Sequence, residues 1–299
     1  MSHEPHEVRI TEDPAEFLAL AEEHLAADPV LTTVVSTVTH RVLAQLERGV
    51  PAPPHPRWWA VVRDGAGAVA GVAMRTAPFA PHPLFVLPMP DDAAVALARA
   101  VHARGEHLGG ANGTLPAARA VAEEAARLQG GAATIWEHTR LFELGELVEP
   151  APVAGGMRRA TVADTDVCLA WFQAFAADAA EQAGRTEGEG HEEYFTREDM
   201  VERIDAGRVW LWEVAGEPVH LTGFNAPSFG VARVGPVYTP KEHRGRGYAS
   251  AGVAEVSRRL LDEGARVCLF TDQANPTSNR IYQALGYRPV VDMANLVVG

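Results

Sequence analysis

A basic, glycine-punctuated turn lies near the carboxyl end of the chain. It reads Arg244-Gly245-Arg246-Gly247-Tyr248-Ala249-Ser250 and follows an apolar stretch that ends at Val237-Tyr238-Thr239-Pro240. A helical repeat of apolar residues begins at Ala249, directly after the glycines. Free backbone N–H groups at the start of a helix suit an anionic group such as a pyrophosphate. The turn is therefore the first candidate binding site.

Pro236 stands inside the strand that we predict over Val231–Thr239. Proline has no backbone N–H and cannot donate to a sheet, so we expect this strand to be unpaired on one side near its end. The backbone groups of Val237, Tyr238 and Thr239 would then be free for a ligand.

Two other nucleotide-binding patterns fit the turn less well. The phosphate loop of nucleotide triphosphatases needs a Gly-Lys-Ser/Thr ending, which this turn lacks. A dinucleotide fingerprint could begin at Gly245-x-Gly247, and Asp272 ends the next predicted strand, but Ser250 replaces the third glycine. Pro236 is also awkward in a central parallel strand. The dinucleotide site remains the weaker alternative.

A second group of polar residues lies one helix and one strand further on. Asn275, Asn279 and Tyr282 stand at positions i, i+4 and i+7 of a predicted helix, with Ser278 beside them. This spacing places them on one face. By itself such a stripe is most simply the solvated side of a helix.

These segments, with the closing Leu285-Gly286-Tyr287, resemble the GNAT acetyltransferases. The resemblance covers roughly residues 157–298, and its motifs stand in the family's order. In that family the pattern Arg/Gln-x-x-Gly-x-Gly/Ala cradles the pyrophosphate of coenzyme A. Arg244, Gly247 and Ala249 match this pattern position for position.

The resemblance implies a set of acetyl-CoA-binding residues and one catalytic residue. The strand end is expected to bind the pantetheine arm through its backbone, the turn to bind the pyrophosphate, and the later helix to touch the pantetheine. The residues so implied are Val237, Tyr238, Thr239, Arg244, Gly245, Arg246, Gly247, Tyr248, Ala249, Ser250, Asn275, Ser278 and Asn279. Tyr282 is expected to protonate the departing thiolate.

A base must also take a proton from an ammonium substrate, directly or through water. Glu213, at the end of a predicted strand, is the first candidate, followed by Glu193 and His220. Each of them is more often structural than catalytic.

The fold class expected is α/β, with a mostly antiparallel mixed sheet flanked by helices in each of two tandem domains. The Pro/Gly segment Glu149–Gly156 is the predicted boundary and gives domains 1–150 and 151–299. The first domain resembles a degenerate GNAT unit by element order alone. In place of a phosphate turn it has Pro88-Met89-Pro90-Asp91-Asp92, which removes N–H donors and repels phosphate. We expect no coenzyme A site there.

Hydrophobic periodicity and turn residues predict the individual elements. We expect helices over 13–27, 30–47, from 91, 115–129, 164–181, 192–206, from 249 and 275–285. We expect strands over 58–62, 69–74, 84–87, 135–144, 157–160, 209–214, 219–224, 231–239, 266–271 and within 287–298. Asn112-Gly113 is predicted to form a turn.

Composition narrows the class of function. The chain has 299 residues, enough for two domains with their own cores, and a formal net charge of -13, which disfavours nucleic acid and anionic membranes. No apolar run approaches a membrane span, and the amino end is no signal peptide. Cys168 and Cys268 form no zinc or disulfide pattern, so we expect a cytoplasmic protein without a metal.

We therefore expect an acetyl-CoA-dependent N-acetyltransferase that acts on a primary amine of a small molecule or peptide, as a monomer or homodimer. Within this class, mycothiol synthase also has two GNAT units, although no feature of the sequence selects it. The alternative from another class is a non-catalytic sensor or scaffold that binds acyl-CoA. Tyr282 favours the enzyme, although a tyrosine there can also simply pack.

Overall fold

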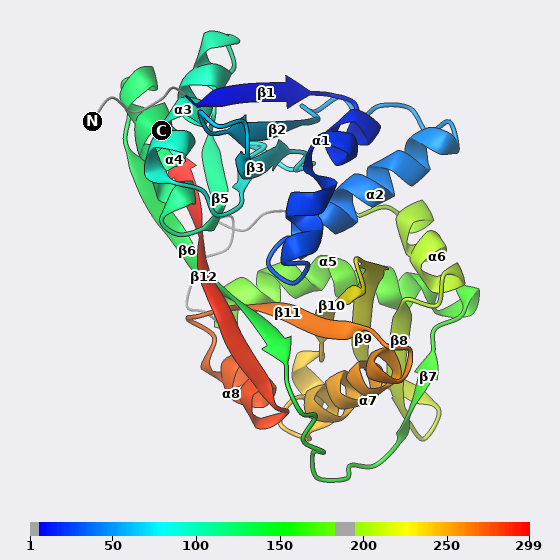
Figure 1. Ribbon diagram of the computed structural model, residues 1–299. Coiled ribbons are helices and arrows are strands. Elements are labelled where there is room, and N and C mark those ends of the chain that lie inside the picture. Colours follow the sequence, from blue (N-terminus) through cyan, green and yellow to red (C-terminus); the bar gives the residue numbers. More distant parts are fainter. Residues whose placement is uncertain (1–5, 183–194) are drawn as a thin grey trace. The chain divides into compact units, whose positions relative to one another are not determined.

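The structure is a computed structural model that describes residues 6–182 and 195–299 (Figure 1). The chain forms two compact units, an N-terminal unit of residues 1–139 and 291–299 and a C-terminal unit of residues 140–290. Each unit is built on strands with helices packed against them.

Two strands run from one unit into the other. β6 (Ala133–Leu144) leaves the N-terminal unit, and β12 (Tyr287–Val298) returns to it. The division therefore differs from the predicted boundary after residue 150, because the Pro/Gly segment Glu149–Gly156 lies inside the C-terminal unit. A Pro/Gly-rich stretch marks a loop, but it does not reveal which strands pair on either side of it.

The N-terminal unit has the strand order β1-β2-β3-β4-β5-β12. Neighbouring strands are antiparallel except for the parallel pair β4–β5. Besides β12, its strands are β1 (Glu7–Thr11), β2 (Trp58–Arg63), β3 (Val69–Arg75), β4 (Leu84–Val86) and β5 (Gly110–Thr114). Its helices are α1 (Pro14–Ala27), α2 (Thr33–Glu47), α3 (Asp91–Ala103) and α4 (Ala117–Gln129).

Successive residues of a strand bury against helices on opposite faces of this sheet. Trp59 is fully buried and stacks on Phe17 of α1, with 6.1 Å between ring centroids. Its neighbour Trp58 packs instead among the residues of α3 and α4. The Trp58-Trp59 pair therefore belongs to the core.

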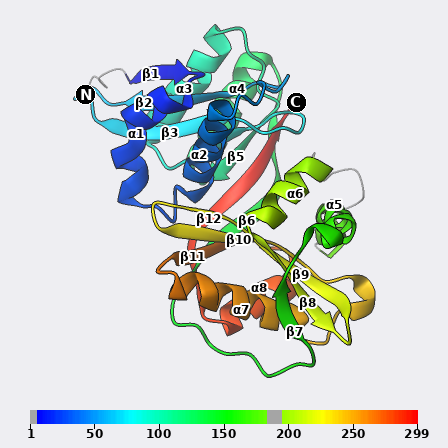
Figure 2. The same ribbon diagram turned by 90° about the vertical axis from the view of Figure 1, so that its right-hand side faces the viewer.

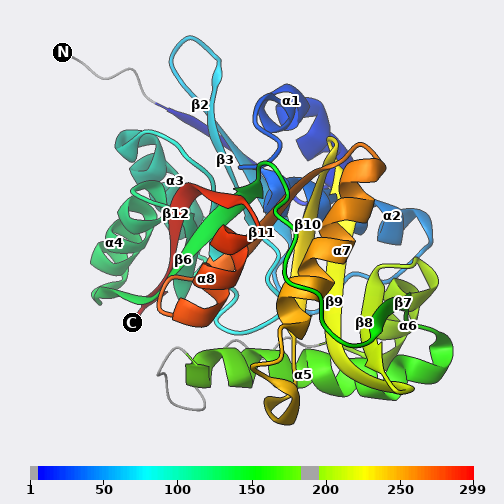
Figure 3. The ribbon, with the colours of Figure 1, turned by 90° about the horizontal axis from the view of Figure 1, so that it is seen from below.

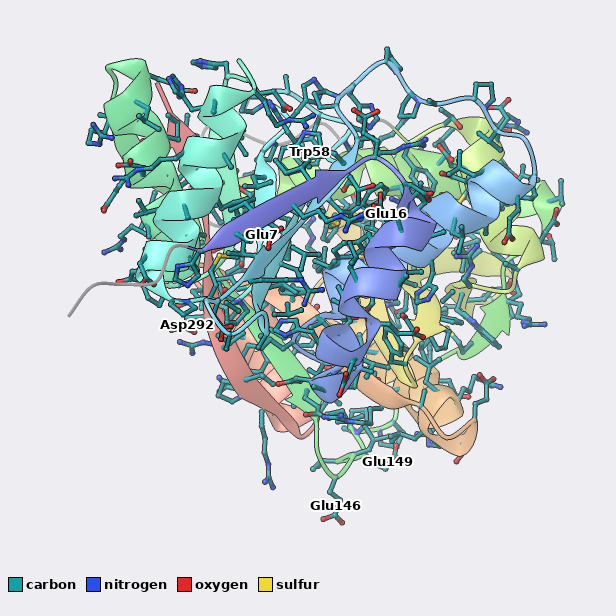
Figure 4. The ribbon with its side chains drawn as sticks, turned by 45° about the horizontal axis from the view of Figure 1, so that its top comes forward. Glu7, Glu16, Trp58, Glu146, Glu149 and Asp292 are labelled. Carbon is teal, nitrogen blue, oxygen red and sulfur yellow. The ribbon has the colours of Figure 1, made fainter. Side chains whose placement is uncertain are left out.

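β1 is a strand that the sequence does not predict, because it is short and mostly polar. It pairs antiparallel with β2 over its whole length. The carboxylate of Glu16, at the start of α1, also accepts hydrogen bonds from Arg9 and Thr11 of β1 (Figure 4). Contacts with other elements supply what the local pattern lacks.

β5 overturns a prediction, because Asn112-Gly113 lies within this strand and is not a turn. Gly113 has φ +133 and lies against β4, where an added Cβ would come within 2.0 Å of the Val86 carbonyl oxygen. The glycine is needed for close approach of two strands, which a turn propensity cannot distinguish from a reversal of the chain.

The C-terminal unit has the strand order β6-β11-β10-β9-β8-β7. β10 and β11 are parallel, whereas β7, β8, β9 and β10 pair antiparallel in succession. Besides β6, its strands are β7 (Gly156–Arg159), β8 (Val209–Val214), β9 (Glu217–Ser228), β10 (Val231–Tyr238) and β11 (Arg266–Asp272). Its helices are α5 (Thr165–Gln182), α6 (Arg197–Asp205), α7 (Tyr248–Asp262) and α8 (Pro276–Ala284), with 3₁₀ turns η1 (Val162–Asp164) and η2 (Lys241–His243).

Helices cover both faces of this second sheet (Figure 2, Figure 3). α7 and α8 pack on one face, where Val253 lies in one hydrophobic cluster with Val234 of β10. α5 and α6 pack on the other, where Phe172 lies in a cluster with Leu211 of β8. The predicted α/β class, with a mixed sheet flanked by helices, is confirmed.

Candidate active site

β10 and β11 separate partway along their length. Their parallel pairing ends at Val234 and Leu269, yet β10 continues to Tyr238. β10 stays paired with β9 as far as Tyr238 and Leu221, across a register shift between Val234 and Val237. Pro236, which has no N–H to donate, lies within that shift. The one-sided opening predicted from this proline is therefore present, and it faces β11.

The glycine turn follows the free end of β10. Gly245 and Gly247 have φ of +75 and +83, values that favour glycine. Gly247 is the N-cap of α7, and no side chain caps the helix there. The N–H groups of the first helical turn, from Tyr248, have no partner within the helix. With the positive end of the helix dipole, they form a site suited to an anion.

Arg244 is held over the end of β10 by two fixed partners. Its Nε donates to the Thr239 carbonyl oxygen at 2.9 Å, and Nη2 donates to Oδ2 of Asp178 in α5 at 2.6 Å. The Tyr238 hydroxyl donates to the same carboxylate oxygen at 2.9 Å. Burial, aided by Asp178, raises the pKa of Tyr238 to about 12. The arginine of the predicted pyrophosphate turn is thus placed by a carboxylate that the sequence pattern does not reveal.

Two further cations of the turn lie nearer to solvent. Lys241 pairs with Glu181 and lies 3.6 Å from Oδ1 of Asp178. Arg246 donates to the Glu242 carbonyl oxygen at 3.2 Å and is exposed. The turn therefore presents several positive charges around the start of α7.

The asparagines of the second motif organise the turn between β11 and α8. The Asn275 side chain caps α8 by accepting from the Ser278 N–H at 3.1 Å. Nδ2 of Asn279 donates to the carbonyl oxygens of Asp272 at 2.9 Å and of Asn275 at 2.7 Å. These hydrogen bonds hold the backbone of the turn, and the expected contact with pantetheine stays a prediction.

Tyr282 is buried beside the point where the strands separate. It shares one hydrophobic cluster with Val234 and Leu269, the last pair of the β10–β11 ladder, and is 7% exposed. Its ring meets Tyr287 edge-on, with centroids 6.0 Å apart. Burial raises the pKa of Tyr282 to about 12, against a smaller opposing effect of a hydrogen bond with Ser278. The phenol is therefore protonated at neutral pH, which a general acid requires.

Glu213 lies away from this opening. It forms an ion pair with Arg158 of β7, which also holds Asp164. Its register partner on β9 is Pro218, three residues beyond Leu221, where the pairing with β10 ends. This placement supports a structural role for Glu213 rather than that of the base. Glu193, the second candidate, lies outside the described residues.

His220, the third candidate, is fully buried and held between two threonines. Nδ1 lies 2.7 Å from Oγ1 of Thr239, and Nε2 lies 2.7 Å from Oγ1 of Thr222. Burial lowers the pKa of His220 to about 3. A ring with both nitrogens engaged and no exposure supports a structural role for His220 rather than that of the base.

The corresponding region of the N-terminal unit is closed. β4 and β5 are parallel and remain paired to Val86 and Gly113, where β4 ends. The helix that follows, α3, has Pro90 as its N-cap and Asp91 and Asp92 in its first turn. This arrangement supports the prediction that the unit has no coenzyme A site.

Two whole-chain features bear on the class of site. Within residues 6–182 and 195–299, no helix is both long and apolar enough to cross a membrane. In the same ranges, no group of three or more His, Cys, Asp or Glu side chains could hold a metal ion. The described residues therefore offer no candidate metal site.

Comparisons with known proteins relate this fold and its C-terminal segment to a protein family and to solved structures. The family model described as FR47-like protein matches residues 226–295, which include β10, the turn, α7, β11 and α8. No curated protein matches the chain. A GNAT-family acetyltransferase from Colwellia psychrerythraea is similar over 98% of this chain and 100% of that chain, with 11% identity and a TM-score of 0.55.

Two further solved structures are similar over almost the whole chain. The similarity to a GCN5-related N-acetyltransferase from Sphaerobacter thermophilus covers 97% of this chain and 94% of that chain, with 16% identity and a TM-score of 0.55. The similarity to a tandem GNAT protein from the clavulanic acid biosynthesis pathway covers 98% of this chain and 99% of that chain, with 15% identity and a TM-score of 0.54. The chain thus has the tandem GNAT fold, and most of the FR47-like match lies in its C-terminal unit.

Proposed function

We propose that the C-terminal unit is an acetyl-CoA-dependent N-acetyltransferase that acetylates a primary amine of a small molecule or peptide by direct attack. The observation that carries this proposal is the opening between β10 and β11 beyond Val234, which leads directly to the glycine turn at the start of α7. One end offers an extended pantetheine arm the edge of β10 that no longer pairs with β11. The other offers N–H groups and Arg244 to a diphosphate.

In the proposed reaction the amine nitrogen attacks the thioester carbon, the C–S bond breaks, and sulfur leaves as a thiolate. A backbone N–H of β10 beyond Val234 polarises the carbonyl oxygen. Tyr282 gives its phenolic proton to the thiolate and regains one from water. The phenol of Tyr282 is protonated at neutral pH, as the donor in this step must be. The excess proton on nitrogen passes to water, and no side chain is assigned as the base.

The remaining assignments follow from charge and from the closed N-terminal unit. We propose that this unit binds no coenzyme A, because β4 and β5 stay paired and two aspartates begin α3. Cys168 and Cys268 are both buried, and no disulfide joins them, which is compatible with the reducing cytoplasm. The net charge of -13 supports a small-molecule or peptide acceptor over nucleic acid.

Calorimetry with acetyl-CoA tests the pyrophosphate assignment. Arg244→Glu with Arg246→Glu should weaken binding at least tenfold, because two attractive charges at the turn become repulsive. Arg119→Glu is the control: it reverses the charge of one exposed arginine of α4 in the N-terminal unit and should leave the affinity unchanged. Equal affinity of the wild-type protein and the double variant would overturn the assignment.

Thiol release over a library of amines then separates the enzyme from the sensor. The proposal predicts acetyl-CoA turnover that depends on at least one primary amine. Tight binding of acetyl-CoA without turnover for any amine would instead favour a non-catalytic acyl-CoA sensor.

A further inference from the structure

The buried polar cluster around His220 is unused by the proposed chemistry. His220 projects from β9 and is 0% exposed, as is Thr222 two residues further on. Both imidazole nitrogens lie 2.7 Å from a threonine hydroxyl, one on β9 and one just after β10. A buried polar side chain costs free energy unless its hydrogen bonds are made, and here both are.

The hydrogen-bonding capacities of the cluster match a neutral imidazole. Neutral histidine has one donor and one acceptor nitrogen, and each threonine hydroxyl can both donate and accept. Burial lowers the pKa of His220 to about 3, so the ring is neutral across the physiological range. The cluster therefore forms a fixed hydrogen-bonded support, and its histidine does not titrate in the physiological pH range.

The cluster braces the segment that has lost a strand partner. Beyond Val234, β10 is paired with β9 alone, and Thr239 follows its last residue. The Thr239 hydroxyl is at hydrogen-bond distance from His220, and the Thr239 carbonyl oxygen accepts from Nε of Arg244. A continuous set of hydrogen bonds thus runs from β9 to the arginine of the glycine turn.

α7 approaches the same ring closely. A Cβ at Gly252 would come within 2.6 Å of Cδ2 and Nε2 of His220 and 3.0 Å of Oγ1 of Thr222. Glycine inside a helix is less favourable than alanine by roughly 1 kcal/mol, so close packing is the reason for its place here. The imidazole therefore contacts both the free end of β10 and the helix whose first turn forms the anion site.

We propose that His220 is a positioning residue for acyl-CoA, which holds the end of β10 and the start of α7 in the spacing that a pantetheine diphosphate requires. This inference rests on the proposed function. It assigns His220 no contact with the ligand and no proton transfer. Its effect reaches the ligand through the end of β10, where the ring contacts the Thr239 hydroxyl and hydrogen-bonds the Tyr238 backbone.

Variants of the two threonines test this role against simple stabilisation. Thr239→Val and Thr222→Val each remove one hydroxyl partner of His220 with little change in volume. Both should lower the free energy of unfolding to a similar degree. Only Thr239→Val should weaken the binding of coenzyme A in calorimetry, by about tenfold (about 1.4 kcal/mol), because only Thr239 lies on the binding segment. Thr239→Ser restores the hydroxyl and should recover most of the loss.

A double-mutant cycle shows whether the effect passes through His220. His220→Gln removes the imidazole that contacts the Thr239 hydroxyl. With that contact already lost, Thr239→Val in the same background should cause little further loss of coenzyme A affinity. Additive losses would mean that the Thr239 hydroxyl meets the ligand directly, and would overturn the inference. Equal affinities of Thr239→Val, Thr222→Val and wild type would overturn it too while leaving the proposed function intact. Failure of the wild-type protein to bind coenzyme A would refute both.

Discussion

Tyr282 and Tyr287 are neighbouring buried phenols with similar surroundings. Both lie in the hydrophobic cluster that contains Val234 and Leu269. Each hydroxyl has a serine partner, Ser278 for Tyr282 and Ser257 of α7, at 2.7 Å, for Tyr287. Burial raises the pKa of both. Neither burial nor shared packing therefore distinguishes an acid from a structural hydroxyl, and kinetics on variants has to.

Replacing each phenol by phenylalanine separates the two roles. Tyr282→Phe should lower kcat by roughly 10²- to 10⁴-fold with little change in KM for acetyl-CoA, because a general acid acts in the transition state. Tyr287→Phe should cost about 1 kcal/mol of stability for the lost hydrogen bond and leave kcat near the wild-type value. Steady-state kinetics on both variants check this. An unchanged kcat for Tyr282→Phe would remove the assigned acid.

His220 makes the stability of the protein sensitive to acid. Its folded-state pKa of about 3 lies below the value of 6.5 in an unfolded chain. The folded state therefore disfavours the protonated ring. The associated stability is fully present above pH 6.5 and is lost as the pH falls toward 3.

Urea unfolding between pH 7 and 4 measures this effect. The wild-type protein should lose stability over that range more steeply than His220→Gln, which has no group to titrate. Subtracting the two curves removes the contributions of other residues, including His24, whose pKa burial also lowers. Parallel curves would show that His220 does not titrate differently on unfolding.

Motif residues were predictable from the sequence, and their partners were not. Arg244, Gly247 and Tyr282 follow a local pattern with a fixed spacing. Asp178, which holds Arg244, lies in a different helix and has no spacing relation to the turn. His220 is a candidate base by its residue type, and only its burial between two threonines indicates a structural role instead.

At the scale of elements, the contact between α7 and β9 depends on the absence of a side chain at Gly252. Gly252→Ala should gain roughly 1 kcal/mol in helix propensity. The added methyl group must displace a buried ring, and overpacking costs about 1–3 kcal/mol. We expect a net loss of stability, together with weaker coenzyme A binding.

Thermal unfolding and calorimetry on the same samples check this expectation. Gly156→Ala is the control, since nothing lies within 4 Å of an added Cβ there, and it should change stability by less than about 0.5 kcal/mol. A Gly252→Ala protein that is as stable as the wild type would show that the ring gives way easily.

Most elements followed from periodicity because they have one clearly buried face or a clear cap. Pro236 even indicated the opening in the sheet, since the lack of an N–H is a property of the residue itself. β1 and β5 did not follow. β1 depends on its pairing with β2 and on the contact of Glu16 with Arg9 and Thr11, and β5 depends on the close approach of Gly113 to β4. Such non-local requirements leave little trace in a single sequence.

At the scale of the whole molecule, the end of the chain completes the first unit. Residues 291–299 belong to the N-terminal unit, where Ala294, Leu296 and Val298 are buried in its core. Met293 to Val297 pair with β5. A fragment ending at the predicted boundary lacks this strand.

A fragment of residues 1–150 should therefore fail to unfold cooperatively, because it lacks a buried strand and exposes the edge of β5. The same fragment joined to residues 287–299 by a flexible linker should regain a cooperative transition, and a scrambled version of that strand should not. Circular dichroism during urea unfolding is the measurement. A cooperative transition in the short fragment, equal to that of the fusion, would contradict the division into units.

The central claim is that acyl-CoA lies in the opening between β10 and β11 of the C-terminal unit. A crystal structure of the acetyl-CoA complex tests it most directly. The predicted result is a diphosphate bound by the backbone N–H groups of Gly247–Ala249 and Arg244, with the thioester between the strands beyond Val234 and close to Tyr282. Acetyl-CoA bound at the start of α3 in the N-terminal unit, or away from the opening, would contradict the claim.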